Sequence, residues 1–245
     1  MRLQGKVALV TGAAKRVGRT IALALAQRGA KLAIHYRHSR TEAQRLADEV
    51  KDNFGREAAL FRADLSDVRE VQRLAQAVLK RFGKVHVLVN SASTYEKNAF
   101  GDTSRADWDG HLDVNLRAPF FLSQALGLAM KRNGEGKIIN IADWSGKRPY
   151  ADYIPYCVSK AGLLCLNAAL AKALAPQVQV SAVLPGPVLL PAAVGPRARR
   201  EIINATLVKR LGSPEDVAQA VLFLIEGSDF VTGAELAVDG GRLIA

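Results

Sequence analysis

Seven short apolar segments recur along the chain, and a stretch with helical periodicity separates each one from the next. The segments span residues 6–10, 31–35, 58–61, 85–89, 137–141, 178–184 and 236–238. Strands that are apolar along their whole length are typical of parallel sheets covered by helices on both faces. The alternation of strand and helix therefore predicts a doubly wound, Rossmann-like α/β fold, with a parallel sheet of about seven strands and helices on both faces.

The segments between the strands carry recognisable helix signals. Apolar residues between positions 17 and 26 recur on one face of a helix. Ser39 and Glu42 have the spacing of a capping box ahead of the second helix. Residues 213–216, Ser-Pro-Glu-Asp, combine an N-cap serine, a first-turn proline and early acids, which predicts a helix start.

The composition favours one domain, residues 1–245. Hydrophobic residues make up 49% of the chain, and no linker-like or low-complexity stretch divides it. No signal peptide is expected at the N-terminus, and no run of roughly 18 apolar residues predicts a membrane span. Cys157 and Cys165 have neither metal-ligand nor CxxC spacing, which favours a reduced, cytoplasmic setting. The four histidines form no ligand set, so no metal is expected.

The formal net charge of +11 is compatible with two kinds of partner, nucleic acid or a small anionic cofactor. The basic residues are dispersed, apart from clusters at residues 15–16, 37–40 and 197–200. No aromatic-basic RNA motif and no zinc-finger spacing is present in the sequence. We therefore expect small-molecule ligands and no nucleic acid or membrane partner.

The first apolar segment is followed by TGAAKRVGRT, in which Gly12 and Gly18 bracket a turn into a helix. Backbone N–H groups at such a helix start, together with the helix dipole, can hold a phosphate. An ordinary tight turn explains the same glycine spacing. Its place after the first strand of a βαβ unit favours a dinucleotide site.

The end of the second predicted strand separates NAD from NADP. An NAD site needs an acid there to accept a hydrogen bond from the ribose 2′-hydroxyl. This strand ends in HYRHS, residues 35–39, and the first acid is Glu42 in the next helix. Basic and hydroxyl side chains can instead bind a 2′-phosphate, and Arg16 adds a cation nearby. The pattern predicts NADP(H), with a solvated basic turn as the alternative.

Two polar residues follow later strands. Asp64, after the third strand, is a candidate acceptor for the adenine amino group, or an acid placed at a helix start. Asn90, after the fourth strand, lies where the backbone has to pass close to the cofactor, or it is a turn former. Both alternatives stay open from the sequence.

Tyr156 and Lys160 are four residues apart, so on a helix they share one face. A phenol with a pKa of about 10 is a poor acid or base at neutral pH. A nearby ammonium favours the phenolate and is expected to move the pKa of the phenol toward neutrality. Tyr156 is thus the predicted proton donor to a substrate that receives hydride. Lys160 is a candidate donor to the nicotinamide ribose.

With these residues in view, the chain resembles the short-chain dehydrogenase/reductase family over nearly its whole length. The matching stretches are TGAAKRVG, ADLSD, VNSAS, DVNLRAPFF, YCVSK, LPGPV, SPEDVA and VTGAELAVDGG. The resemblance implies a Rossmann-like fold, a nicotinamide cofactor and, often, a homotetramer. It also implies that Asn115 holds a water in a proton relay with Lys160, and that Tyr156 is the acid.

The residues that the motifs and the resemblance together assign to the cofactor are Gly12, Arg16, Val17, Gly18, His35, Tyr36, Arg37, His38, Ser39, Asp64, Leu65, Asn90, Ser91, Ala92, Tyr156, Lys160, Pro185, Gly186 and Val188. The last three are expected to line the nicotinamide.

Two positions depart from the usual family pattern. Arg16 replaces the usual third glycine of the loop, and Asp143 replaces the usual catalytic serine. Ser145 is near, but its register does not match. Both departures resemble the pteridine reductases, in which an aspartate stands thirteen residues before the tyrosine. That resemblance also implies a substrate site at Ser93, Tyr95 and Asp143, with the Tyr95 ring stacked on a pterin.

Asp143 is the residue that separates the possible reactions. Ketone reduction needs a hydroxyl beside the tyrosine, whereas reduction of a ring C=N bond must also deliver a proton to nitrogen. We hypothesise that Asp143 and Tyr156 form a coupled acid pair, because burial can raise the pKa of a carboxyl group. The alternative is that Asp143 caps a turn with its side chain directed away from the site.

Three functions follow from these alternatives. The first is NADPH-dependent reduction of a pterin-like heteroaromatic compound. The second is reduction of a carbonyl compound such as a 3-oxoacyl thioester, and the third is a non-catalytic NADP-binding sensor. The segment Leu189–Arg200 corresponds to the family's substrate lid. Its arginines 197, 199 and 200 either meet an anionic substrate tail or form a solvated basic helix.

Overall fold

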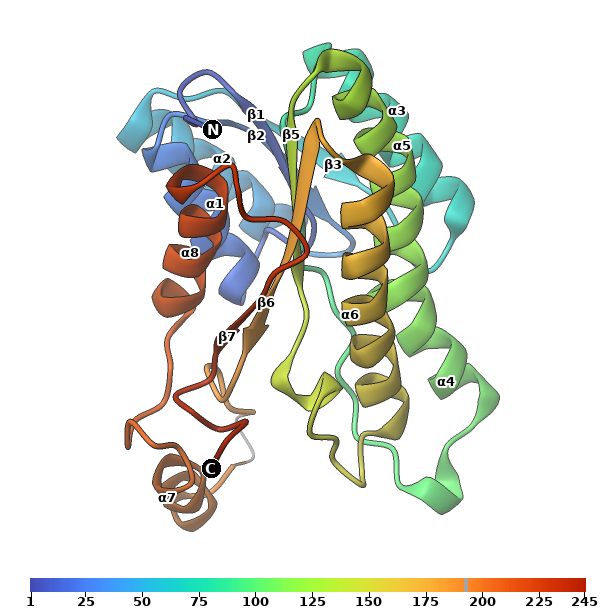
Figure 1. Cartoon of the computed structure of the whole chain (residues 1–245), viewed down its shortest axis with the longest axis vertical. Helices are drawn as coiled ribbons and strands as arrows, with labels where there is room; N and C mark the ends of the chain where they lie inside the picture. The colour runs from blue at the N-terminus through green and yellow to red at the C-terminus, as the bar shows by residue number, and fades with distance from the viewer. Residues whose placement is uncertain (192–193) are drawn as a thin grey trace.

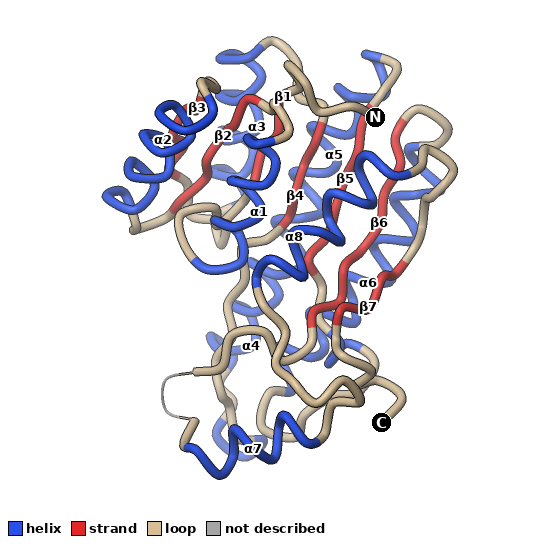
Figure 2. The backbone as a smooth tube through the Cα atoms, turned by 90° about the vertical axis from the view of Figure 1, so that its left-hand side faces the viewer, coloured by secondary structure: helices blue, strands red, loops and turns tan. Residues whose placement is uncertain are grey.

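The computed structural model describes residues 1–191 and 194–245, and its seven strands form one parallel sheet in the order β3-β2-β1-β4-β5-β6-β7. The strands are β1 (Val7–Val10), β2 (Lys31–Tyr36), β3 (Ala58–Arg62), β4 (Val87–Asn90), β5 (Gly136–Ile141), β6 (Val178–Pro185) and β7 (Glu235–Val238). The predicted doubly wound sheet is confirmed, and Figure 2 shows the strands side by side in this order.

Helices cover both faces of the sheet (Figure 1). One layer contains α1 (Arg16–Gln27), α2 (Arg40–Phe54) and α8 (Pro214–Leu222), and the other contains α3 (Val68–Phe82), α5 (Ala118–Asn133) and α6 (Ile154–Leu174). A π-helical turn, η2 (Asp113–Arg117), joins α4 (Arg105–Leu112) to α5. The short helix α7 (Pro196–Asn204) lies beyond the carboxyl ends of the strands, near the C-terminus (Figures 1 and 2).

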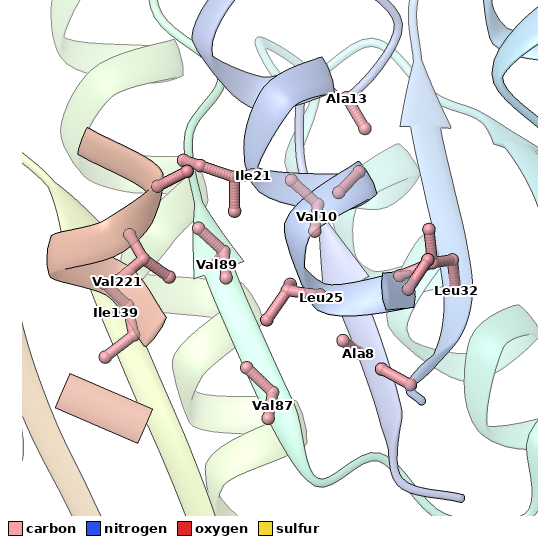
Figure 3. Packing of buried hydrophobic residues seen from close by; sticks show 14 of the residues in the cluster. Ala8, Val10, Ala13, Ile21, Leu25, Leu32, Val87, Val89, Ile139 and Val221 are labelled. Atoms are coloured by element: carbon pink, nitrogen blue, oxygen red, sulfur yellow. The ribbon is translucent and has the colours of Figure 1, made fainter. Parts of the chain in front are cut away.

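The core on the α1 and α8 side is built from the branched side chains of the central strands. Val10, Val89 and Ile139 pack with Ile21 of α1 and Val221 of α8 (Figure 3). All five side chains are almost completely buried. Burial of each such side chain stabilises the fold by about 1.5–3 kcal/mol. The centre of the sheet is therefore a rigid support for the loops at its carboxyl edge.

The two predicted helix starts have different outcomes. Ser213 and Asp216 form the predicted capping box at the start of α8. Ser39 is the N-cap of α2, but its side chain makes no capping hydrogen bond, and Glu42 instead pairs with Lys15 at 2.7 Å. The predicted box at Ser39 is wrong because the backbone of Ser39 is not in the extended conformation that caps usually adopt.

Helix α6 is the one helix in the described ranges that is long and apolar enough to cross a membrane. Half of its most apolar 18-residue window is buried within the molecule, and the helix packs along β6. A buried core helix passes the same test of length and composition. Its buried face carries Tyr156 and Lys160 to the carboxyl end of the sheet.

Candidate active site

The turn after β1 fits closely against the loop after β4. A Cβ atom at Gly12 would lie 2.9 Å from Ala92 Cα, and one at Gly18 would lie 2.4 Å from the Gly12 carbonyl oxygen. Gly12 also has a φ of +64°, which favours glycine. The Thr11 hydroxyl oxygen accepts the N–H groups of Ser91 (2.9 Å) and Ala92 (3.0 Å). The glycines are thus required by close backbone packing at the predicted phosphate turn.

His35 is a brace for this turn and not a phosphate ligand. Its Nδ1 atom accepts the Gly12 N–H at 3.0 Å, and its Nε2 atom lies 3.1 Å from the Ala63 carbonyl oxygen. Burial lowers the pKa of His35 to about 4, so the ring is neutral. Both ring nitrogens are engaged, which corrects the predicted cofactor contact of this side chain. The Tyr36 ring is likewise buried in the core, so only its backbone borders the turn.

The side chains that follow Tyr36 are available to a ligand. Arg37 and His38 are exposed and Ser39 is half-buried. Arg37 Nη2 pairs with Asp64 Oδ2 at 2.8 Å. Partial burial acts to raise the pKa of Asp64, but hydrogen bonds from Ser66 and the charge of Arg37 lower it overall. The turn after β2 is therefore basic, and its first acid is Glu42 in α2.

Asp64 does not begin a helix. The N-cap of α3 is Asp67, whose side chain accepts the Arg69 N–H, so the alternative interpretation of Asp64 as a helix-start acid is wrong. Leu65 beside it is buried. Asp64 uses one carboxylate oxygen for Ser66 and the other for Arg37. An adenine amino group would have to share these oxygens, so that contact stays a prediction.

Arg16 occupies a left-handed backbone conformation, with a φ of +54°. The turn therefore keeps a shape that favours glycine, although the residue is an arginine. The exposed side chain reaches the segment after β6, where its Nη2 atom donates to the Leu189 carbonyl oxygen at 3.2 Å. Val17 beside it packs against the core. Arg16 thereby links the turn after β1 to the segment after β6.

Asn115 lies in the π-helical turn and holds the loop after β4. Its Oδ1 atom accepts the Thr94 N–H at 2.9 Å, and its Nδ2 group donates to the Thr94 carbonyl (3.0 Å) and to the Ser159 hydroxyl (3.0 Å). The side-chain amide is therefore fully occupied by protein partners. The predicted role of Asn115 in holding a water stays a prediction, and the side-chain amide has no hydrogen-bonding capacity left over for it.

A buried row of asparagines, which was not predicted from the sequence, crosses the sheet beneath the site. Asn90 donates to Asn140 (2.9 Å), and Asn140 donates to Asn167 of α6 (3.1 Å). All three side chains are at least 97% buried. Asn90 is thus the end of a strand and a member of a polar network, not a turn former. Asn90 and Asn140 are register partners on β4 and β5, a pairing that no local sequence pattern indicates.

The predicted reacting residues lie together, because the carboxyl end of β5 is next to the first turns of α6. The Tyr156 hydroxyl donates to Asp143 Oδ2 at 3.0 Å. The Lys160 ammonium donates to the Ile141 carbonyl at 2.9 Å and lies 5.6 Å from the centroid of the Tyr156 ring. Asp143 also caps the short helix η3 (Trp144–Gly146) by accepting the Ser145 N–H at 2.8 Å. Asp143 therefore caps a turn and faces Tyr156 at the same time.

The electrostatics of this group differ from the expected pattern. Burial and the adjacent Asp143 carboxylate raise the pKa of Tyr156 well above its usual value. Burial also raises the pKa of Asp143, and burial lowers the pKa of Lys160 to about 8. The expectation that Lys160 moves the Tyr156 pKa toward neutrality is therefore wrong for the protein alone. The proton rests on the phenol and is directed at a carboxyl group able to share it.

Aromatic rings form a wall beside Tyr156. Tyr95 is 46% exposed, stacks on Tyr153 with a centroid separation of 4.7 Å and an angle of 8°, and meets the Tyr156 ring edge-on at 4.7 Å. Ser93 is exposed and its hydroxyl donates to the Thr94 carbonyl. One face of Tyr95 is thus covered by Tyr153, while nearly half of the residue's surface stays accessible to a flat ligand.

The residues expected at the nicotinamide follow β6. Pro185 ends the strand, and Val188 is 8% exposed. A Cβ atom at Gly186 would lie 2.6 Å from Asp239 Cα, so only glycine fits there. In the segment Leu189–Arg200, residues 192–193 lie outside the described residues. Arg197 pairs with Glu201 at 3.0 Å on the exposed helix α7.

No metal site accompanies this arrangement in the part of the chain that the structure describes, where no group of three His, Cys, Asp or Glu side chains is placed to hold an ion.

Comparison with known proteins relates the chain to a large group of enzymes. Residues 12–242 match the family model described as Enoyl-(Acyl carrier protein) reductase. The chain is 35% identical to D-threitol dehydrogenase of Mycolicibacterium smegmatis, covering 99% of this chain and 95% of that protein. It is 32% identical to 3-oxoacyl-[acyl-carrier-protein] reductase FabG of Staphylococcus epidermidis, covering 96% and 98%.

Solved structures show the same fold with either nicotinamide cofactor. A blue fluorescent protein from a metagenomic library, in complex with NADPH, superposes with a TM-score of 0.92 at 33% identity, over 100% of both chains. A 7α-hydroxysteroid dehydrogenase complexed with NADH and 7-oxo glycochenodeoxycholic acid superposes with a TM-score of 0.93 at 31% identity, over 98% of this chain and 95% of that chain.

Proposed function

Because the chain belongs to the short-chain dehydrogenase/reductase family and is an NAD(P)-dependent oxidoreductase, we propose that it reduces a carbonyl compound with NADPH. The observation that carries this proposal is the buried Tyr156 on α6 with the Lys160 ammonium 5.6 Å from the centroid of its ring. The names of the relatives, a polyol dehydrogenase and a 3-oxoacyl thioester reductase, favour a carbonyl group over a pterin.

The preference for NADPH rests on the turn after β2. Arg37 and His38 are exposed, and no acid follows the strand before Glu42, which pairs with Lys15. A 2′-phosphate would replace or share the Asp64 partner of Arg37, and charge-assisted hydrogen bonds to phosphate are among the strong ones. An acid at this position, which NAD sites use for the ribose 2′-hydroxyl, is missing from the sequence of the turn.

The reaction divides between cofactor and protein. The nicotinamide, when bound, supplies a hydride to the carbonyl carbon. The Tyr156 phenol turns its proton from Asp143 to the carbonyl oxygen, and the Lys160 ammonium stabilises the phenolate that remains. A protonated Asp143 donates a second hydrogen bond to the same oxygen, as a serine hydroxyl would. The raised pKa of Asp143 favours that protonated form.

A second candidate substrate is a flat heteroaromatic compound with a C=N bond, such as a dihydropterin. Asp143 beside Tyr156 favours it, because a carboxyl group can supply the proton that ring nitrogen requires. The accessible part of the Tyr95 ring offers a stacking surface for a planar substrate. Asp143 is therefore the specific feature that supports this second candidate substrate in addition to a carbonyl compound.

Parallel assays of NADPH absorbance test these proposals. The purified protein is mixed with NADPH or NADH and with acetoacetyl thioester, a quinone or a dihydropterin. We expect oxidation of NADPH with the first two compounds, and a clear preference for NADPH over NADH. Turnover of dihydropterin alone would select the second candidate. Cofactor binding without any turnover would contradict both and leave the sensor function.

The homotetramer and the cytoplasmic location stay predictions from the resemblance and the composition. Size-exclusion chromatography with light scattering tests the first, and cell fractionation tests the second.

A further inference from the structure

We infer that Ser145 is a positioning residue for the reaction, and that its hydroxyl sets how the Asp143 carboxyl group shares a proton with Tyr156. The inference rests on the proposed role of Asp143 and Tyr156 as a proton-donating pair. Ser145 lies two residues after the position of the family's catalytic serine, so it matches no position of the family motif.

The geometry places Ser145 directly against Asp143. Asp143 is the N-cap of η3, and the Ser145 N–H donates to its Oδ1 atom at 2.8 Å. The Tyr156 hydroxyl donates to the other oxygen, Oδ2, at 3.0 Å. The two oxygens of the carboxyl group are therefore held from opposite sides. Ser145 fixes the orientation that presents Oδ2 to the phenol.

The Ser145 hydroxyl is the second part of the argument. Ser145 is completely buried, and among the described residues its Oγ atom has no hydrogen-bond partner. Buried polar groups are normally paired, so an unpaired hydroxyl beside a reacting group requires an explanation. The backbone N–H of Ser145 holds the residue against Asp143, and the Ser145 side chain acts to lower the pKa of the carboxyl group.

A hydroxyl hydrogen can rotate, and the oxygen can both donate and accept. Ser145 can therefore donate to Asp143 when the carboxyl group is ionised and accept from it when the group is protonated. A backbone N–H can only donate. The unpaired hydroxyl is thus suited to a carboxyl group that changes protonation state during a turnover.

Other groups also face Asp143 and have to be kept constant in a test. These are Tyr156 and Lys160 of α6, Tyr95 after β4 and Tyr150 before α6. Burial is the largest influence on the Asp143 pKa and raises it, whereas Ser145, Lys160 and Tyr156 lower it. Substitution of Ser145 alone leaves these neighbours in place.

The decisive comparison is Ser145→Ala with Ser145→Thr. Loss of a donor to a carboxylate raises its pKa, so Ser145→Ala should move the fall in kcat/KM that follows deprotonation of Asp143 to higher pH by about one pH unit. Ser145→Thr keeps the hydroxyl and should retain the wild-type profile. Ser181→Ala, at a buried serine of β6, is the matched control and should not move the profile.

A readout without turnover separates this inference from the proposed function. NMR of aspartate labelled at its carboxyl carbon, with the Asp143 signal assigned by its loss in Asp143→Asn, reports the titration directly. A higher titration midpoint in Ser145→Ala, restored in Ser145→Thr, supports the inference even if every assayed substrate is wrong. An unchanged midpoint in a folded Ser145→Ala protein would overturn it.

Discussion

The Tyr156 hydroxyl donates a hydrogen bond to Oδ2 of Asp143 at 3.0 Å, so the proposed acid of the reaction is itself the partner of a second acid. Two buried groups at this distance titrate as a pair and not as independent sites. A serine in place of Asp143 would provide a hydroxyl but no second proton reservoir. The activity of variants at residue 143 should therefore distinguish between the two candidate substrates.

Asp143→Asn and Asp143→Ser should separate the two candidate substrates. Both replacements keep a hydrogen-bond donor, so turnover of a carbonyl compound should stay within about tenfold of the wild type. Turnover of a ring C=N compound should fall by about 100-fold or more, because general acid catalysis contributes about 10²–10⁴-fold. The measurement is kcat/KM for both substrate types. Full activity of both variants on every accepted substrate would exclude an acid pair.

Tyr156→Phe should abolish most turnover while leaving the cofactor bound. Removal of the phenol hydroxyl takes away the proposed proton donor, and kcat is expected to fall by about 10²–10⁴-fold. The ring and its edge-on contact with Tyr95 remain. Cofactor binding, followed by fluorescence, is the internal control. A variant that binds NADPH normally and still reduces substrate at the wild-type rate would remove Tyr156 from the mechanism.

The alkaline limb of the activity profile should report Lys160. Burial lowers the pKa of its ammonium to about 8, so the positive charge is present below that pH and is lost above it. We expect kcat/KM to decline as pH rises through about 8. Lys160→Met should remove this limb together with most activity. A wild-type profile that stays flat to pH values well above 8 would show that the ammonium is not needed.

Arg37→Ala should weaken NADPH and not NADH. A hydrogen bond to a charged group contributes about 1.5–3 kcal/mol, so the Kd for NADPH is expected to rise about 10- to 100-fold. Lys51→Ala, at an exposed position in the last turn of α2, removes the same charge away from the turn and serves as the control. Equal losses in both variants would point to general electrostatic attraction. Equal losses for NADH and NADPH would contradict a 2′-phosphate site at Arg37.

His35 should make the fold sensitive to acid. Its folded-state pKa of about 4 lies below the usual 6.5, so the unfolded chain binds a proton between these values and the native state does not. Stability is thus fully present above pH 6.5 and is lost as pH falls toward 4. The contribution is at most about 3 kcal/mol.

The measurement is urea unfolding at several pH values for the wild type and for His35→Gln. The difference between their pH slopes cancels the other titrating groups. We expect the variant to be less stable at neutral pH and to lose less stability on acidification. Identical slopes would mean that the ring accepts a proton without disturbing the Gly12 N–H.

The parallel sheet and its covering helices follow from local patterns, and the placement of Asp143 beside Tyr156 follows from the family resemblance. Apolar strands alternating with helices define the sheet, and the parallel topology brings the ends of β5 and α6's first turns together. Family registers then assign Asp143 to the serine position. These features depend on neighbours in the sequence or on regular topology, and for this reason they were predictable.

The side-chain partners were less predictable, because they depend on tertiary contacts. His35 sits in a basic stretch, yet its strand position directs the ring inward to Gly12 and Ala63. The Tyr156 pKa depends on burial and on Asp143 more than on the lysine four residues away. The capping box at Ser39 does not form because the Ser39 backbone is not extended, and Glu42 pairs with Lys15 instead.

Asn115 gives the site a common reference point. Its side-chain amide forms hydrogen bonds with the N–H and the C=O of Thr94 and with the Ser159 hydroxyl. That hydroxyl in turn donates to the Tyr156 carbonyl. The Asn115 side chain therefore fixes the distance between the Tyr95 ring, which would contact a substrate, and the Tyr156 phenol, which would protonate it. A small rotation of the Asn115 amide would disturb substrate placement and proton transfer together. Natural selection on either property therefore constrains the same residue.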